Sequence, residues 1–430
     1  MKDQIKLYAC CIATLLASLL TVPVLASAGP DQLAYASQIL KEGSHSAVKK
    51  LSHQERTILQ ATAALKGDHP GEALALLDSA KNRDPLVALL EAEAHRQQAI
   101  LAMREAGSFG ENIGQEEMLA SADLNRGLGE ADARLNSFMD KVNEVSGNPI
   151  DILLPGPDVE NIFMFDKARN RLYVYQPDAS GKLKKVADEY VVTGSVAGDK
   201  QRQGDGKTPN GIYRFIKKLQ GKDLESRYGP VAFPIDYPNE LDKLHQKDGY
   251  GIWLHGYPLD VLRRPPQDTR GCFSLSNSSL TKVARLVKLK RSWVIAGENF
   301  EFDRDSDKQT LLESVQRDIE SWKQDWTSLD SEAYLSHYHQ QFRSGHRDLK
   351  AWKSYKRRIN ANKAFVEVKF SNFTLMRDPT RWAEGEVVLA EFDQAYRSSN
   401  YADQGRKRLY LARDSKTSPW KILLEESLKR

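Results

Sequence analysis

The sequence predicts a multidomain protein with an all-α N-terminal region, a mainly-β middle domain and a C-terminal α+β domain. The N-terminal part is rich in Ala, Leu, Glu and Gln and lacks strand-like alternation. The middle changes to short β-branched and aromatic runs, and the C-terminal part places amphipathic helices before alternating strands. At 430 residues the chain is too long for one ordinary core, so about two to three domains are expected.

The N-terminus has the pattern of a secretory signal peptide. Two lysines precede an apolar run from Leu7 to Leu25, and Ala26-Ser27-Ala28 supplies a small-residue cleavage site. We expect residues 1–28 to be removed and the protein to be exported to the periplasm; the alternative is an uncleaved membrane anchor. Cleavage would leave Cys272 as the only cysteine of the mature chain, because the other two lie within the signal.

Charge and histidine spacing argue against several function classes. Lys+Arg 62 against Asp+Glu 58 leave a net charge of +4, and the basic residues are interleaved with acids, so no nucleic-acid partner is expected. His337 and His339 would point to different faces of a helix, and the N-terminal histidines have no ligand spacing. We therefore expect no metal site and no cofactor.

The helical region is expected to span residues 29–148. Ser52-His53-Gln54-Glu55 has the form of a capping box, and Gly67-Asp68 followed by Pro70 marks a tight turn between two helices. Asp84-Pro85 opens a third helix. The alternation of small and large residues resembles one tetratricopeptide-like hairpin, but a stable array needs about three repeats, so a solitary helical hairpin that contacts a protein partner is expected.

Strand-like runs follow Asn148-Pro149 and define a mainly-β domain at residues 158–297. The turn-dense loop 204–211 interrupts these runs, and Ile252-Trp253-Leu254 is expected to be a strand that ends at His255. An acidic linker, 298–307, comes next. In the last unit, 308–430, two helices precede a set of four alternating strands.

The stretch 251–277 carries the candidate chemistry. It contains Cys272 and, upstream of it, His255, which are the minimum inventory for a cysteine nucleophile and its general base. Because a free thiol has a pKa of about 8.5, we expect His255 and the nearby Arg270 to activate Cys272 as a thiolate. Gly271 would let the backbone turn and present its amide to an oxyanion. The alternative is a buried, inert cysteine.

The order of three motifs resembles the L,D-transpeptidase (YkuD) family. These motifs are GDGKTPNG at 204–211, IWLHG at 252–256 and TRGCF at 269–273, and the segment 229–239 looks like the YafK-like branch. The resemblance covers roughly residues 158–297. It implies a Cys272 nucleophile, a His255 base and acid, and peptidoglycan stem peptides as substrate. The carbonyl of Gly256 would orient the imidazole.

Two departures from the family pattern concern substrate preference. Many members have histidine where this chain has Arg270, and many place arginine or asparagine where this chain has Ser274. Tyr250, Thr269, Arg270 and Asn277 are expected to contact substrate, with Arg270 either binding a carboxylate or tuning the thiol.

The C-terminal unit resembles a nuclear transport factor 2-like (NTF2-like) domain of the kind appended to some enzymes of this fold. The resemblance rests on Trp322-x-x-x-Trp326, on residues 330–338 and on 392–401, among others. It implies binding or homodimerisation rather than a second active site.

These features favour a periplasmic L,D-transpeptidase. Cys272 would attack the L-centre carbonyl of meso-diaminopimelate in a tetrapeptide stem, release D-alanine and pass the acyl group to an amine. If water is the acceptor, the protein is an L,D-carboxypeptidase that trims tetrapeptides to tripeptides and affects cell shape. A third interpretation is a non-catalytic peptidoglycan-binding scaffold. The sequence does not separate the first two.

Overall fold

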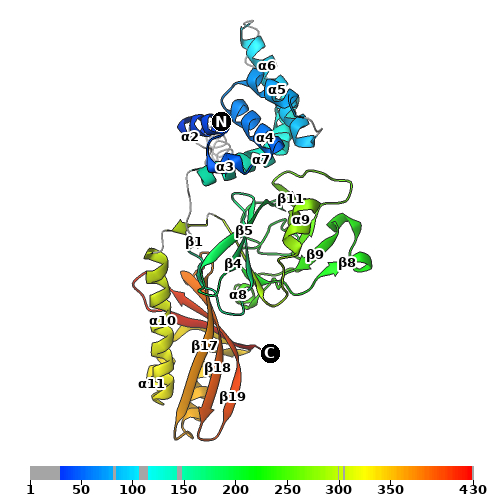
Figure 1. Ribbon diagram of the computed structural model, residues 1–430. Coiled ribbons are helices and arrows are strands. Elements are labelled where there is room, and N and C mark those ends of the chain that lie inside the picture. Colours follow the sequence, from blue (N-terminus) through cyan, green and yellow to red (C-terminus); the bar gives the residue numbers. More distant parts are fainter. Residues whose placement is uncertain are drawn as a thin grey trace, which may run out of the picture.

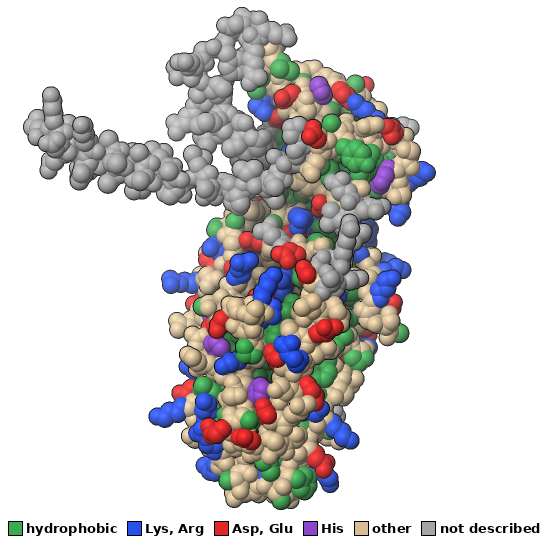
Figure 2. Space-filling view, turned by 90° about the vertical axis from the view of Figure 1, so that its left-hand side faces the viewer, with side chains coloured by type: hydrophobic (Ala, Val, Ile, Leu, Met, Phe, Trp, Pro, Cys, Tyr) green, Lys and Arg blue, Asp and Glu red, His purple; other side chains and the backbone are tan. Residues whose placement is uncertain are grey.

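The computed structural model describes residues 30–80, 84–105, 115–142, 148–298, 300–303 and 306–428, so the expected signal peptide lies outside the described residues. Figure 1 shows three parts in succession: a group of helices, a compact β domain and a long curved sheet with helices along it. Among the described helices, none combines the length and hydropathy that a membrane crossing requires. On the face shown in Figure 2, acidic and basic side chains are interspersed.

The helical domain is a bundle, larger than the solitary hairpin expected from the sequence. Ser52 caps its second long helix as expected, accepting the Glu55 amide at 3.1 Å, and Pro70 occupies the first turn of the following helix. Two small apolar clusters, one around Ile58 and Leu90 and one around Leu40 and Phe138, hold the helices together. The described helices are α2 (Pro30–Glu42), α3 (Ser46–Lys49), α4 (His53–Lys66), α5 (Pro70–Asp78), α6 (Pro85–Glu105) and α7 (Gln115–Val142).

The middle domain is mainly β, as predicted, and packs two sheets around one core. A five-stranded sheet has the order β5-β4-β3-β13-β7, and a four-stranded sheet has the order β12-β10-β9-β8. Phe165 of one sheet stacks on Phe273 of the other with ring centroids 4.0 Å apart. The elements are β3 (Asn161–Asp166), β4 (Arg171–Pro177), β5 (Leu183–Tyr190), β6 (Thr193–Gly194), β7 (Gly211–Arg214), β8 (Leu219–Gln220), β9 (Val231–Pro234), β10 (Trp253–Gly256), β11 (Gln267–Thr269), β12 (Phe273–Leu275) and β13 (Ser292–Gly297), with helices α8 (Glu240–Leu244) and α9 (Asn277–Ala284).

The C-terminal domain has the predicted α+β form. Its sheet has the order β16-β15-β20-β19-β18-β17-β2, and an aromatic core around Trp322 and Trp326 fills the space under its helices. Strand β2 (Ile152–Leu154) enters this sheet from the segment that precedes the middle domain. The other elements are α10 (Ser306–Thr327), α11 (Ser331–Ser336), β15 (Tyr338–Ser344), β16 (Arg347–Asp348), α12 (Leu349–Asn360), β17 (Val366–Arg377), β18 (Glu386–Ser398), β19 (Ala402–Arg413) and β20 (Lys421–Leu428), while β1 (Asn148–Pro149) pairs with β14 (Phe302–Asp303).

A buried carboxylate joins the middle and C-terminal domains. Glu391 on β18 accepts hydrogen bonds from Arg214 of the middle domain at 2.7 Å, from Arg406 at 2.6 Å and from Arg408 at 2.9 Å. Burial by itself raises the pKa of Glu391, but the three guanidinium groups outweigh it and leave the pKa below its usual range. The group is therefore a permanent anion between three cations.

Replacing Glu391 with alanine should destabilise the protein by about 3 kcal/mol, because Arg214 loses its carboxylate partner and Arg406 and Arg408 each lose one of theirs. The free energy of unfolding from denaturant titration measures the loss. Glu367→Ala is the matched control, since Glu367 forms an exposed pair with Arg397 at 2.8 Å, and it should change the unfolding free energy far less. Equal losses in the two variants would contradict the assignment.

Candidate active site

The two candidate catalytic residues lie on adjacent parallel strands. In the pairing of β10 with β12, Leu254 lies opposite Phe273 and His255 lies opposite Ser274. Because side chains alternate along a strand, Leu254 and Phe273 enter the core together while His255 and Ser274 share the other face. Cys272 directly precedes β12. The alternation thus buries the apolar pair and leaves the histidine beside the thiol-bearing turn.

A backbone carbonyl orients His255. Its Nδ1 lies 2.6 Å from the carbonyl oxygen of Gly256, and the Ser274 hydroxyl donates to the same oxygen at 3.2 Å. A carbonyl can only accept, so Nδ1 carries the ring hydrogen and Nε2 keeps its lone pair. The ring of Tyr228 packs edge-on against the imidazole, with centroids 5.1 Å apart. The tautomer is therefore the one that a general base needs.

Burial keeps the imidazole neutral. It lowers the pKa of His255 to about 4, a shift that the Gly256 hydrogen bond opposes and the positive charge of Arg264 reinforces. Across the neutral pH range His255 can accept a proton. Once protonated in the site, it is a stronger acid than an ordinary imidazolium.

The surroundings of Cys272 favour the neutral thiol over the thiolate that the sequence led us to expect. Burial raises the pKa of the thiol to about 11, against opposing effects of the Trp253 amide, Lys200 and Arg264. The thiol donates to the carbonyl of Gly251 at 3.4 Å. Among the described residues, Cys272 and His255 form no hydrogen bond with each other. The resting pair is therefore thiol and imidazole, not thiolate and imidazolium.

The turn before Cys272 is held by Thr269. Its hydroxyl accepts the Gly271 amide at 3.1 Å and donates to the Cys272 carbonyl at 2.7 Å. Gly271 has φ +119°, and a Cβ there would lie 2.6 Å from the carbonyl oxygen of Lys207. The structure thus places Thr269 as a support of the turn, and it ties up the Gly271 amide that we expected at an oxyanion.

The motif at 204–211 is the scaffold behind that turn. Asp205 accepts hydrogen bonds from the amides of Gln201 and Arg202 at 2.8 and 3.0 Å and from Lys200 Nζ at 2.8 Å. Although burial raises it, these donors hold the pKa of Asp205 well below its usual range. The loop is therefore rigid where the Lys207 carbonyl meets Gly271.

Besides Thr269, the expected substrate residues lie in two kinds of place. Tyr250 is 74% exposed, and Arg270 is exposed as well. Asn277 begins α9, and its Oδ1 fills the space beside Gly256 and Gly229, where a Cβ would lie 2.1 and 2.4 Å from it. Asn277 therefore packs against the strand that carries His255. Tyr250 and Arg270 remain the accessible candidates.

Sequence reasoning missed several residues of the site. Tyr228 and Gly251 contact the histidine and the thiol, and Lys200 and Arg264 are the cations that act on the thiol. Strand alternation could have placed Ser274 near His255. No local pattern points to the others, because each reaches the site from a different loop.

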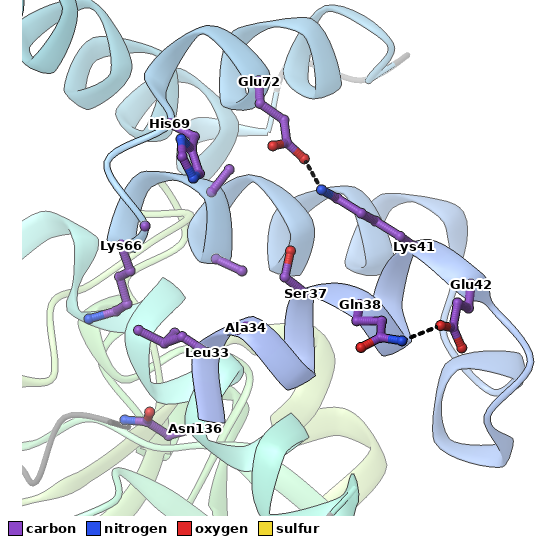
Figure 3. Close-up of a pocket in the computed structure, with 13 residues that line it drawn as sticks. Leu33, Ala34, Ser37, Gln38, Lys41, Glu42, Lys66, His69, Glu72 and Asn136 are labelled. Carbon is purple, nitrogen blue, oxygen red and sulfur yellow. Dashed lines mark hydrogen bonds and ion pairs between the residues drawn. The ribbon is translucent and has the colours of Figure 1, made fainter. Parts of the chain in front are cut away.

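A cavity of about 720 Å³ lies elsewhere, in the helical domain. Figure 3 shows Lys41 reaching Glu72 across one side of it and Lys66 and Asn136 on the other. It contains none of the candidate catalytic residues. Among the residues that the structure describes, no group of three or more His, Cys, Asp or Glu side chains could hold a metal ion.

Two segments of the chain match known domain families. Residues 160–295 match the L,D-transpeptidase catalytic domain, YkuD, and residues 314–426 match the Cds6 C-terminal NTF2-like domain. The putative L,D-transpeptidase YafK of Escherichia coli (strain K12) is 32% identical over 90 residues, which are 21% of this chain. The chain spans about a third (32%) of the length of that curated relative.

Two solved structures are similar over a longer stretch. The helical cell shape determining protein Pgp2 of Campylobacter jejuni is 33% identical with a TM-score of 0.56, and the match covers 66% of this chain and 97% of that one. Bd1075 of Bdellovibrio bacteriovorus is 26% identical with a TM-score of 0.58, covering 66% and 99%.

Fold and site together define a protein with an L,D-transpeptidase-type domain followed by an NTF2-like domain. The chain belongs to the YkuD L,D-transpeptidase family and is similar to YafK and Pgp2.

The neutral pair predicts two pH dependences. Alkylation of Cys272 by iodoacetamide, which requires the thiolate, should keep rising with pH up to about 11. The kcat/KM of any turnover that uses His255 as the base should rise with pH through about 4. His255 is protonated below that pH, and only the neutral imidazole can act as a base. Mass spectrometry of the alkylated protein and initial rates measure the two profiles. An alkylation profile that levels off near neutral pH would show a preformed ion pair instead.

Gly271→Ala should abolish turnover or folding, since a methyl group would meet the Lys207 carbonyl in a backbone conformation that L residues rarely adopt. Gly204→Ala is the matched control: its φ is also positive, at +80°, but nothing lies within 4 Å of the added carbon. The control should cost only about 1–2 kcal/mol of strain. Melting temperature and alkylation of Cys272 report both effects, and equal behaviour of the two variants would rule out the contact.

Proposed function

We propose that this protein is a periplasmic peptidoglycan-modifying cysteine enzyme that acts on stem tetrapeptides with Cys272 as nucleophile. The observation that carries the proposal is the hydrogen bond from His255 Nδ1 to the Gly256 carbonyl, 2.6 Å long, in a domain matched to L,D-transpeptidases. It leaves Nε2 as a free base on the strand adjacent to the thiol. A scaffold that only bound peptidoglycan would have no need of a fixed imidazole tautomer.

Acylation begins with transfer of the thiol proton. The Cys272 side chain rotates away from the Gly251 carbonyl and gives its proton to His255 Nε2 while sulfur attacks the L-centre carbonyl of meso-diaminopimelate. The carbonyl oxygen becomes an oxyanion. Because Thr269 already holds the Gly271 amide, the backbone amide of Cys272 is the donor that we assign to this oxyanion.

Collapse of the intermediate releases D-alanine. The C–N bond breaks, and imidazolium His255, made acidic by burial, protonates the leaving amine. The acyl group stays on sulfur as a thioester. An amine acceptor on a second stem then yields a 3-3 cross-link, and His255 takes the proton from that amine; if water is the acceptor, the product is a tripeptide.

The relatives support a role in cell-wall architecture. Pgp2 is a helical cell shape determining protein, and YafK is a putative L,D-transpeptidase. We propose that the reaction of this chain likewise alters peptidoglycan and cell shape. Arg270 and Tyr250, both exposed beside the site, are the residues that we assign to substrate contact.

Incubation of the purified protein with disaccharide tetrapeptide should release D-alanine, read by mass spectrometry. A 3-3 linked dimer identifies a transpeptidase, and tripeptide identifies an L,D-carboxypeptidase. Cys272→Ala should abolish product formation and His255→Ala should lower kcat by about 10²–10⁴-fold, the range that general-base catalysis supplies.

Ser274→Ala is the matched control for these variants, because it removes a hydroxyl from the same face without touching nucleophile or base. It should keep most of the activity. Unchanged substrate with the native protein, or unchanged activity in Cys272→Ala, would leave only the non-catalytic scaffold.

A further inference from the structure

About a third of this chain, a share that corresponds to the helical domain and the residues before it, lies outside the matches to Pgp2 and Bd1075. Pgp2 and Bd1075 match along 97% and 99% of their own length but cover only 66% of this chain, and both matched family models lie within residues 160–426. Figure 1 places this domain against the end of the middle domain that carries β11 and α9. Its contacts there show what the extra domain does.

One arginine makes the main polar contact between the two domains. Arg263 lies in the loop 257–266, which runs from β10 to β11. Its Nε donates to Asp84 Oδ1 at 3.1 Å, its Nη2 donates to the other oxygen of Asp84, and its Nη1 donates to Glu130 Oε1 at 2.6 Å. The side chains of Asp84 and Glu130 are only 11% and 3% exposed. Two carboxylates of the helical domain thus bind the guanidinium group of Arg263 in the loop.

The helical domain presents two carboxylates, Asp84 and Glu130, to Arg263. Within that domain Arg134 pairs with Glu55 and Glu130 and acts on Asp84 only as a nearby positive charge. Arg263 supplies a second guanidinium, which pairs with Asp84 and Glu130. Burial raises the pKa of Asp84, but hydrogen bonds from Arg263 and from the Leu86 amide outweigh it and lower the pKa overall. Asp84 and Glu130 are therefore stabilised by a cation from outside the helical bundle.

Apolar contacts hold the two ends of the same loop. A Cβ on Gly129 of α7 would lie 2.6 Å from Pro266, so glycine lets the helix approach the loop closely. Tyr257, at the other end, is buried in a cluster with Ala133 of α7. Between these ends Leu259 and Leu262 are each 68% exposed. Hydrogen bonds to the middle domain hold Arg264 and Pro266, and the helical domain adds contacts to Tyr257, Arg263 and Pro266.

The loop connects the supports of both catalytic residues. It starts after Gly256, whose carbonyl fixes His255, and leads into β11, where Thr269 holds the turn of Cys272. Arg264, next to Arg263, donates to Asp268 at 2.8 Å, and its carbonyl accepts the hydroxyl of Tyr190. A displaced Arg263 would therefore shift the positive charge of Arg264, which acts on both His255 and Cys272.

We propose that the helical domain is a positioning domain for the active site and that Arg263 is the positioning residue through which it fixes the loop between His255 and Cys272. The consequence for turnover rests on the proposed enzymatic function; the fixing of the loop does not. Arg263 itself is kept off the substrate by its two carboxylate partners.

The test compares the full chain with Arg263→Gln and, from the other side of the contact, Asp84→Asn. Hydrogen exchange read by mass spectrometry should show the amides of 257–266 exchanging about tenfold faster in both variants, because a locally held loop opens when its anchor is lost. The alkylation rate of Cys272 at fixed pH should change with it. Arg263→Lys should recover part of the protection, since an ammonium replaces the charge but not the forked geometry.

Arg96→Gln is the matched control. Arg96 makes a two-pronged pair with Glu93, at 2.7 Å for each bond, wholly within α6, and its loss should leave the loop unchanged. Unaltered exchange of 257–266 in both Arg263→Gln and Asp84→Asn would overturn the proposal. If the native protein shows no turnover, exchange and alkylation still decide the role of Arg263, so failure of the proposed function and failure of this inference are separate results.

Discussion

The parallel pairing of β10 with β12 is the constraint on which the site depends. It sets His255 opposite Ser274 and brings the Cys272 turn to the same end of the sheet. A shift of one residue in this register would turn His255 into the core and Leu254 out of it. The apolar pair Leu254 and Phe273 therefore fixes the register, because a slip would put the imidazole of His255 in their place in the apolar core.

Burial sets the electrostatics of the catalytic pair. The same enclosed position that lowers the pKa of His255 raises that of Cys272, so both groups rest uncharged. A neutral thiol reacts slowly with oxidants and electrophiles. In the mechanism that we propose, the nucleophile is generated when His255 takes the thiol proton as the carbonyl is attacked.

Arginine–carboxylate clusters fix the middle domain on two sides. Glu391 binds Arg214 across the interface with the NTF2-like domain, and Arg263 binds Asp84 and Glu130 across the interface with the helices. Buried pairs of this kind add little net stability compared with apolar packing, but they penalise any wrong orientation in which a charge loses its partner. The two clusters thus define how the accessory domains sit on the catalytic one.

Local patterns determined much of this protein from its sequence. Hydrophobic periodicity predicted the order of the all-α, mainly-β and α+β domains. Three short motifs predicted the family, because each is a contiguous run that can be recognised without knowing which distant residues it contacts. Other features were decided by tertiary structure. The protonation of Cys272 depends on burial, the hydroxyl of Thr269 is used within its turn, Asn277 packs behind Gly256, and Arg263 finds partners more than a hundred residues away. Burial and long-range ion pairs arise only when separate segments pack together, which is why no single stretch of sequence could reveal them.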